Sequence, residues 1–140
     1  RLPALVFISV EVYKYKMIKG DNMINFTNHP YEMWDDAQKR AASEFGDIKE
    51  IPFPAVDPSA TEEELDNLAE EYRKKVLALQ DPMILLQGEF TLSFRLVQLL
   101  KKDGLKVVAA CSERRVHEWR DDDSKYHKEM LFEFVQFRRY

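Results

Sequence analysis

The sequence has little of what several protein classes require. Cys111 is the only cysteine among 140 residues, so the chain can form no internal disulfide, and we expect a reducing, cytoplasmic compartment. Only three histidines are present, which argues against a structural zinc site. No apolar run approaches the roughly 20 residues that a membrane span needs, so we expect no membrane partner.

Two glycine-rich nucleotide motifs are also missing. No G-x-G-x-x-G follows the first regular strand pattern, and no G-x-x-x-x-G-K-[ST] stretch occurs. These absences argue against NAD-dependent dehydrogenases and P-loop NTPases. The formal net charge of −4 does not suggest the basic face that duplex nucleic acid usually requires, so we expect no such partner. This net charge is still compatible with a small anionic ligand, because a pocket can be locally positive.

What is present fits one globular domain. Apolar residues make up 45% of the chain and charged residues 33%, and 140 residues suit a single core. Residues 1–22 contain an alternating strand pattern with Val6, Ile8, Val10 and Val12. We predict one domain over residues 23–140, preceded either by an extra edge strand or by an extension upstream of a native start at Met23.

Short strands alternate with helices from Met23 onward. The apolar patterns predict strands at 23–26, 48–51, 82–87 and 105–110, and helices at 32–45, 61–79 and 89–103. The second predicted helix, at 61–79, begins with a capping box, Thr61-Glu62-Glu63-Glu64. The continuous apolar run at 82–87 fits a strand buried on both faces. The order predicts an α/β fold with a mostly parallel, doubly wound sheet flanked by helices.

The C-terminal segment departs from this alternation. Residues 115–120 and 126–139 have strand patterns, and Asp121-Asp122-Asp123-Ser124 between them reads as a solvated turn. We therefore predict a terminal antiparallel β-hairpin. His117 and His127 fall in this hairpin, where we expect surface positions.

Polar residues follow three of the four predicted parallel strands. These segments are Asn25–Pro30, Gln87–Thr91 and Cys111–Arg114. In open α/β sheets, ligands bind outside the carboxyl ends of the strands, where the strand order reverses. The sequence therefore predicts a ligand site at which the three segments converge.

The segment Gln87-Gly88-Glu89-Phe90-Thr91 joins a buried strand to a helix. A helix N-terminus offers free amides to a phosphate, and Gly88 lets a ligand approach the backbone. Gln87 could read a base edge or ribose, Thr91 could offer its hydroxyl, and Phe90 could stack on a base. The alternative is a tight turn in which glycine only relieves strain and Phe90 belongs to the core.

The other two segments carry candidate catalytic groups. His29 could act as a general acid or bind a phosphate or base, or it could simply hydrogen-bond the backbone of its loop. Ser112 with Arg114 could hold an anion, because a guanidinium matches phosphate geometry. Alternatively, Arg114 pairs with Glu113 or a partner subunit. Cys111 has no neighbouring base in the sequence, and we expect it to pack at a strand end.

These stretches resemble a known family. "INFTNHP", "LLQGEF", "VVAACSER" and the closing "LFEFVQFRRY", in this order over residues 23–140, are similar to small CRISPR-associated proteins with a CARF-type, Rossmann-like fold, in particular the stand-alone ring nucleases. The resemblance implies a homodimer that holds a cyclic oligoadenylate, most often cyclic tetraadenylate, in a shared cleft. It implies no metal and no cofactor. It further implies that the ribose 2′-hydroxyl attacks the neighbouring phosphate, and that this cleavage ends a type III CRISPR antiviral signal.

The resemblance also implies roles for the residues at the three strand ends. It makes His29 an acid or phosphate ligand, and Ser112 and Arg114 transition-state stabilisers. The ligand-binding residues that it implies are Asn25, Thr27, Asn28, Gln87, Gly88, Glu89, Phe90, Thr91 and Glu113. No lysine is present at these strand ends. That leaves open a protein that binds the messenger without cleaving it, or a Rossmann-like protein for another nucleotide.

Overall fold

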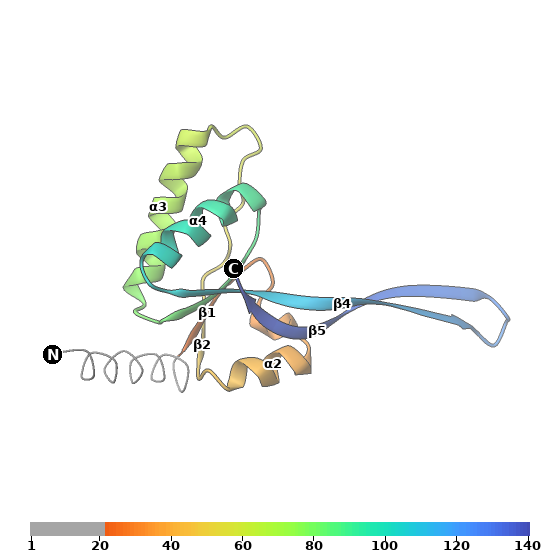
Figure 1. The fold of residues 1–140 in the computed structure, drawn as a ribbon. Helices are drawn as coiled ribbons and strands as arrows, with labels where there is room; N and C mark the ends of the chain where they lie inside the picture. The colour runs from red at the N-terminus through yellow and green to blue at the C-terminus, as the bar shows by residue number, and fades with distance from the viewer. Residues whose placement is uncertain (1–21) are drawn as a thin grey trace.

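A five-stranded sheet with helices on both faces forms the centre of the computed structural model, which describes residues 22–140 (Figure 1). The strand order is β2-β1-β3-β4-β5. The first four strands along the chain are mutually parallel, and β5 is antiparallel to β4. The strands are β1 (Met23–Thr27), β2 (Ile48–Glu50), β3 (Met83–Gln87), β4 (Lys106–Arg120) and β5 (Tyr126–Arg139). The strand or extension predicted before Met23 lies outside the described residues, apart from Asn22.

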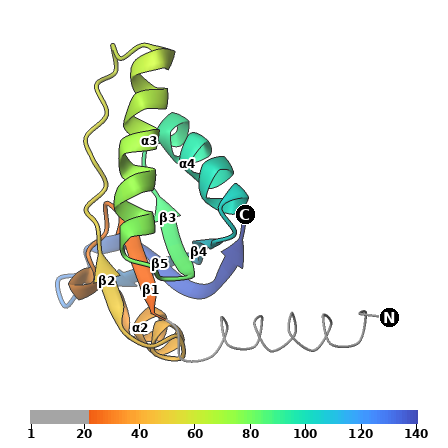
Figure 2. The ribbon, with the colours of Figure 1, turned by 90° about the vertical axis from the view of Figure 1, so that its left-hand side faces the viewer.

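The helices follow the predicted order with one correction. Helices α3 (Glu62–Ala78) and α4 (Phe90–Lys102) lie side by side over one face of the sheet (Figure 2), and α2 (Asp36–Ser43) covers the other. The predicted helix at 32–45 is instead a 3₁₀ turn, η1 (Tyr31–Met33), followed by α2. Trp34 is extended, and the Asp35 side chain accepts from the Gln38 N–H at 2.8 Å, so a new helix begins at Asp36.

The predicted capping box at the start of α3 is confirmed. Thr61 Oγ1 accepts from the Glu64 N–H at 3.1 Å, and Glu64 Oε2 accepts from the Thr61 N–H at 2.9 Å. These bonds satisfy two backbone donors that no preceding turn could satisfy. They explain why α3 begins immediately after the proline-containing linker.

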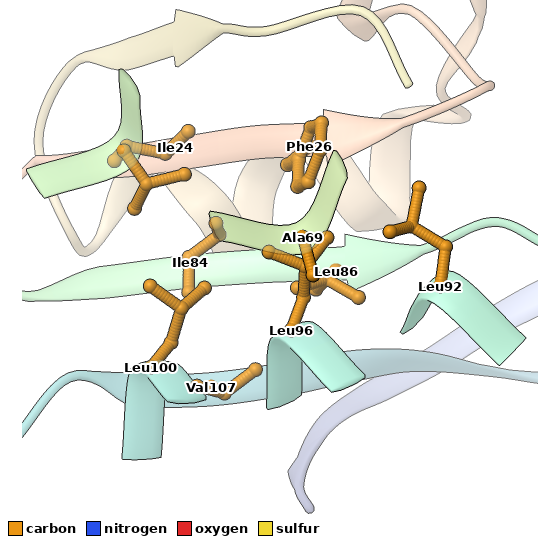
Figure 3. Packing of buried hydrophobic residues seen from close by; sticks show 10 residues of the cluster. Ile24, Phe26, Ala69, Ile84, Leu86, Leu92, Leu96, Leu100 and Val107 are labelled. Atoms are coloured by element: carbon orange, nitrogen blue, oxygen red, sulfur yellow. The ribbon is translucent and has the colours of Figure 1, made fainter. Parts of the chain in front are cut away.

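The core lies on both faces of β1 and β3, as the apolar run at 82–87 predicted. Ile24, Phe26, Ile84 and Leu86 face α3 and α4, which contribute Ala69, Val76, Leu92, Leu96 and Leu100 (Figure 3). Side chains alternate along a strand, so the intervening residues Met23, Met83 and Leu85 face the opposite way and pack against Trp34 and Ala42. Helices are therefore required on both sides of the sheet.

Strand β4 is longer than predicted. We expected it to end at Ala110, with a separate hairpin strand at 115–120, but it is one 15-residue strand from Lys106 to Arg120. It pairs with β3 over Lys106–Val108 only, while β5 pairs with it from Val108 to Arg120. A register shift between Cys111 and Ser112 marks the place where this pair leaves the sheet. Residues 112–134, called the arm below, project away from the body (Figure 1).

The strand order reverses between β1 and β3. From β1 the chain passes to β2 on one side, and β3 and β4 follow on the other. Thr27 and Gln87 are register partners at the carboxyl ends of β1 and β3. The fold therefore places two of the three polar segments side by side at the switch point. No helix within residues 22–140 is long and apolar enough to cross a membrane.

Leu96→Ala tests the core on the α4 side. Leu96 is completely buried, so truncation should lower the free energy of unfolding by about 2–5 kcal/mol. Phe94→Ala on the same helix is the control, because Phe94 is 62% exposed. Urea unfolding of both variants measures the difference, and equal losses would contradict this packing.

Candidate functional site

A pocket of about 310 Å³ lies at the carboxyl-terminal edge of the sheet, on the face that α2 covers. All three predicted polar segments contribute to its lining: Thr27, Asn28 and His29 after β1, Gln87 at the end of β3, and Ser112 on β4. The remaining lining residues are Met33, Trp34, Asp35, Gln38, Leu85, Ala110 and Phe132. We call this cavity the strand-tip pocket. The predicted convergence of the three segments is thus a feature of the structure.

The loop after β1 is held by hydrogen bonds to one carbonyl group. The oxygen of His29 lies 3.1 Å from Asn25 Nδ2, 3.0 Å from Thr27 Oγ1 and 3.0 Å from Trp34 Nε1. The Thr27 hydroxyl also accepts from the His29 N–H at 3.0 Å. Asn25 and Thr27 are buried, so their side chains position the loop, while Asn28 and His29 are exposed. Of the four residues predicted here, these last two are free to meet a ligand.

Asp35 links helix α2 to strand β5 in the pocket wall. Its carboxylate caps α2 through Gln38 and also accepts from the Phe134 N–H of β5 at 3.1 Å. These two backbone bonds, the one from Gln38 first, hold the pKa of Asp35 below its ordinary value. The Asp35-x-x-Gln38 spacing is a helix-start signature that the sequence interpretation did not use. Its contact with Phe134, 99 residues away, has no local signal.

The side chain of Gln87 continues the pairing between β3 and β4. Its Oε1 accepts from the Ala110 N–H at 2.9 Å, and its Nε2 donates to the Ala110 carbonyl at 3.3 Å. The backbone register of the two strands ends at Leu85 and Val108, so the amide group takes the place of the next backbone pair. Gln87 lines the pocket, but its amide is engaged in the fold rather than free to read a base.

Gly88 lies against an aromatic ring rather than against the pocket. A Cβ at this position would collide with ring carbons of Phe53, and that ring stacks on Phe26 in the core at 5.0 Å between centroids. Close packing therefore requires glycine here. Gly88 is not among the residues that line the strand-tip pocket.

The N-terminus of α4 is already occupied by a carboxylate. Glu89 accepts from the Leu92 N–H at 2.8 Å, and the Thr91 hydroxyl lies 2.8 Å from the same carboxylate. The bond from Leu92 is the main cause of the lowered pKa of Glu89. Phe90 is 89% exposed, so it is not a core residue. Glu89, Phe90 and Thr91 are not among the residues that line the strand-tip pocket. A phosphate at the N-terminus of α4 would face the negative charge of Glu89.

On β4, only the first of the three predicted residues lines the pocket. Glu113 forms an ion pair with Arg115 at 3.2 Å, on the face of the strand opposite to Ser112. Arg114 emerges on the same face as Ser112, with its Nε 3.1 Å from the Met130 sulfur. Its register partner is Phe132, which lines the pocket, but Arg114 itself is not among the lining residues. Cys111 is half-buried and free.

The strand-tip pocket has few ionisable groups. Among its lining residues only His29 and Asp35 can carry charge. Within residues 22–140, no three His, Cys, Asp or Glu side chains gather in a way that would hold a metal ion. Hydrogen-bonding groups from Asn28, His29 and Ser112 and apolar surface from Trp34 and Phe132 suit a small polar molecule with a flat, apolar part.

Fold and pocket together define an α/β protein with a doubly wound, mostly parallel sheet and a polar cavity where the strand order reverses. Within that class, the chain belongs to the family described as "Uncharacterized protein MJ1673 family", whose family model matches residues 21–138. The match includes the strand-tip pocket and nearly all of β5. No curated protein and no solved structure matches the chain.

Asp35→Ala tests the pocket wall. At neutral pH we expect the loss of about 1 kcal/mol of stability, which is typical for an N-cap. Because the folded-state pKa of Asp35 is lowered, its charge stabilises the fold above the unfolded pKa of about 3.9, and this contribution disappears as pH falls through the folded pKa. The difference from wild type should therefore shrink in acid. Urea unfolding at neutral pH and in acid measures this difference, with Asp122→Ala in the exposed turn between β4 and β5 as control.

Gly88→Ala separates packing from ligand contact. The added methyl group must displace the Phe53 ring, so the ligand-free protein should lose about 1–3 kcal/mol of stability. In a Phe53→Leu background the same substitution should cost less, which a double-mutant cycle of urea unfolding measures. A Gly88→Ala protein with wild-type stability would contradict the packing role.

Proposed function

We propose that this protein binds a cyclic oligoadenylate, with cyclic tetraadenylate as the main candidate, in the strand-tip pocket and cleaves it without a metal ion. The observation that carries the proposal is the convergence of the segments at Thr27–His29, Gln87 and Ser112 on one cavity. These are the stretches in which the sequence resembles ring nucleases. The biological role that follows is to end the signal of a type III CRISPR antiviral response.

The size of the pocket bears on how such a ligand would bind. At about 310 Å³, the pocket lies at the lower end of the range of small-molecule sites, which is roughly 300–1,000 Å³. One chain therefore suits a single nucleotide unit better than a complete ring. A cyclic ligand would be shared by two copies whose carboxyl-terminal sheet edges face each other, and we accordingly propose a homodimer.

The proposed chemistry needs no protein nucleophile. The ribose 2′-hydroxyl loses its proton as its oxygen attacks the adjacent phosphorus, the bond to the 5′-oxygen breaks, and the leaving oxygen takes up a proton, so that a 2′,3′-cyclic phosphate and a 5′-hydroxyl remain. His29 is the exposed imidazole at the pocket, and it would transfer the proton to the leaving 5′-oxygen. Ser112 would donate a hydrogen bond to the phosphate. Arg114 would turn from Met130 towards the same charge.

Binding without cleavage is the second candidate function. One observation favours it: the lining of the pocket includes no lysine or arginine, although developing phosphate charge is usually stabilised by cations. In this case the protein would sequester the messenger intact. A site for another nucleotide is the third possibility and predicts no affinity for cyclic oligoadenylates.

The decisive experiment incubates the full chain with labelled cyclic tetraadenylate in the presence of EDTA. Linear products support the ring-nuclease proposal, and we expect His29→Ala to slow their formation by roughly 100-fold or more, with a smaller effect on affinity. Gln98→Ala, on the exposed side of α4, is the control and should behave as wild type. Tight retention of intact ligand would favour sequestration. Absence of any thermal shift across a panel of cyclic oligoadenylates would refute both.

A further inference from the structure

The arm has two open edges. Beyond Cys111, strand β4 pairs only with β5, and within residues 22–140 no other strand pairs with either of them along the arm. At its base, the Phe134 N–H is satisfied by Asp35, but further out the edge has no such cover among the described residues. An isolated two-stranded hairpin is at best marginally stable in water, and open edges pair readily with other strands.

The arm also concentrates exposed apolar side chains. Eleven large hydrophobic residues are exposed in the described part of the chain, and six of them lie in the arm, between Val116 and Phe132, at 39–68% exposure. They include Tyr126, Met130 and Phe132. An aromatic side chain can bury about 150–250 Å², so the three aromatic residues among them, Trp119, Tyr126 and Phe132, leave on the order of 300 Å² for a partner. Together with the paired backbone edges, these side chains would supply part of the roughly 800 Å² that each partner buries in a stable interface.

We infer that the arm binds the arm of a second copy of this chain, in an antiparallel arrangement about a two-fold axis. Charge favours this partner over a nucleic acid or a membrane. Residues 112–134 contain five Lys or Arg and seven Asp or Glu, interleaved in sequence. A surface with this mixture of charges has no excess of positive charge to attract a polyanion. It can form pairs of opposite charge with a second surface of the same composition.

The sequence of each arm edge is complementary to itself. Val116 and Met130 are register partners in the middle of the arm, and a two-fold axis there would place equivalent residues opposite each other. If the β4 edges meet, Arg114 faces Glu118 of the other copy; if the β5 edges meet, His127 faces Glu133. In neither case do two carboxylates, or two Lys or Arg side chains, face each other across the centre of the interface. Cross-strand pairs of opposite charge stabilise antiparallel pairing, and like charges oppose it.

This interface also concerns the strand-tip pocket. Ser112 and Phe132 line the pocket and lie at the base of the arm, so an arm held by a second copy would fix one wall of the cavity. The inference itself rests on the arm alone. It therefore stands or falls independently of the ligand proposed above.

Oligomeric state tests the inference directly. Sedimentation velocity of the full chain over a range of concentrations should show a dimer. Met130→Lys and Val116→Lys each place a charge in the centre of the interface and should weaken dimerisation at least tenfold, with unchanged circular dichroism. Phe94→Lys, an equally exposed position on α4, is the matched control and should remain dimeric. A monomeric wild type, or a dimer unaffected by both arm variants, would overturn the inference.

Cross-linking tests the arrangement of the arms. In a Cys111→Ser background, the residue at the two-fold axis should form a disulfide-linked dimer on oxidation: Val116→Cys if the β4 edges meet, and Met130→Cys if the β5 edges meet. Ser124→Cys should not, because it lies in the turn, six residues from Met130; at about 3.3 Å per residue, that is roughly 20 Å from the axis. A disulfide through Ser124→Cys, with none through either Val116→Cys or Met130→Cys, would rule out antiparallel arms.

Discussion

Burial of the two central strands on both faces is the constraint on which the rest of the structure depends. All five residues of β1 and the first four of β3 are buried, so helices must cover both sides of the sheet. Parallel strands need long crossover connections, and these reverse direction between β1 and β3. The carboxyl ends of the two strands are left uncovered by a crossover, so the polar segments that follow them meet there.

The strand-tip pocket is built largely from groups that already have hydrogen-bond partners. Asn25, Thr27 and Trp34 converge on the His29 carbonyl, Gln87 bonds to Ala110, and Asp35 bonds to α2 and β5. Buried polar groups require such partners, and their bonds give the cavity a defined wall. The side chains that remain free are few and exposed, chiefly those of His29 and Ser112. A ligand would therefore enter a preformed site.

The pocket and the arm share residues, so the proposed ligand binding and the proposed association would be connected. Strand β4 supplies core packing through Val107 and Val108, the pocket wall through Ser112, and the apolar surface of the arm through Val116. Along its length, this one strand therefore contributes to the core, to the pocket wall and to the arm. If two copies join through their arms, each pocket gains support from a contact that a single chain cannot make.

Local sequence patterns were enough to predict the order of the elements, the capping box at Thr61, the burial of β3 on both faces, the limits of β5 and the three polar segments. These features depend on neighbours within a few residues, or on the alternation of side chains along a strand. The continuation of β4 to Arg120 could not be predicted in this way. The stretch at 112–115 is polar and has no strand pattern, and it is extended because its backbone pairs with β5. Only the tertiary structure decided that Gly88 accommodates Phe53, that the Gln87 amide bonds to Ala110, and that Asp35 reaches Phe134. Each of these contacts joins residues at least 23 positions apart, and no local pattern encodes a partner at that distance.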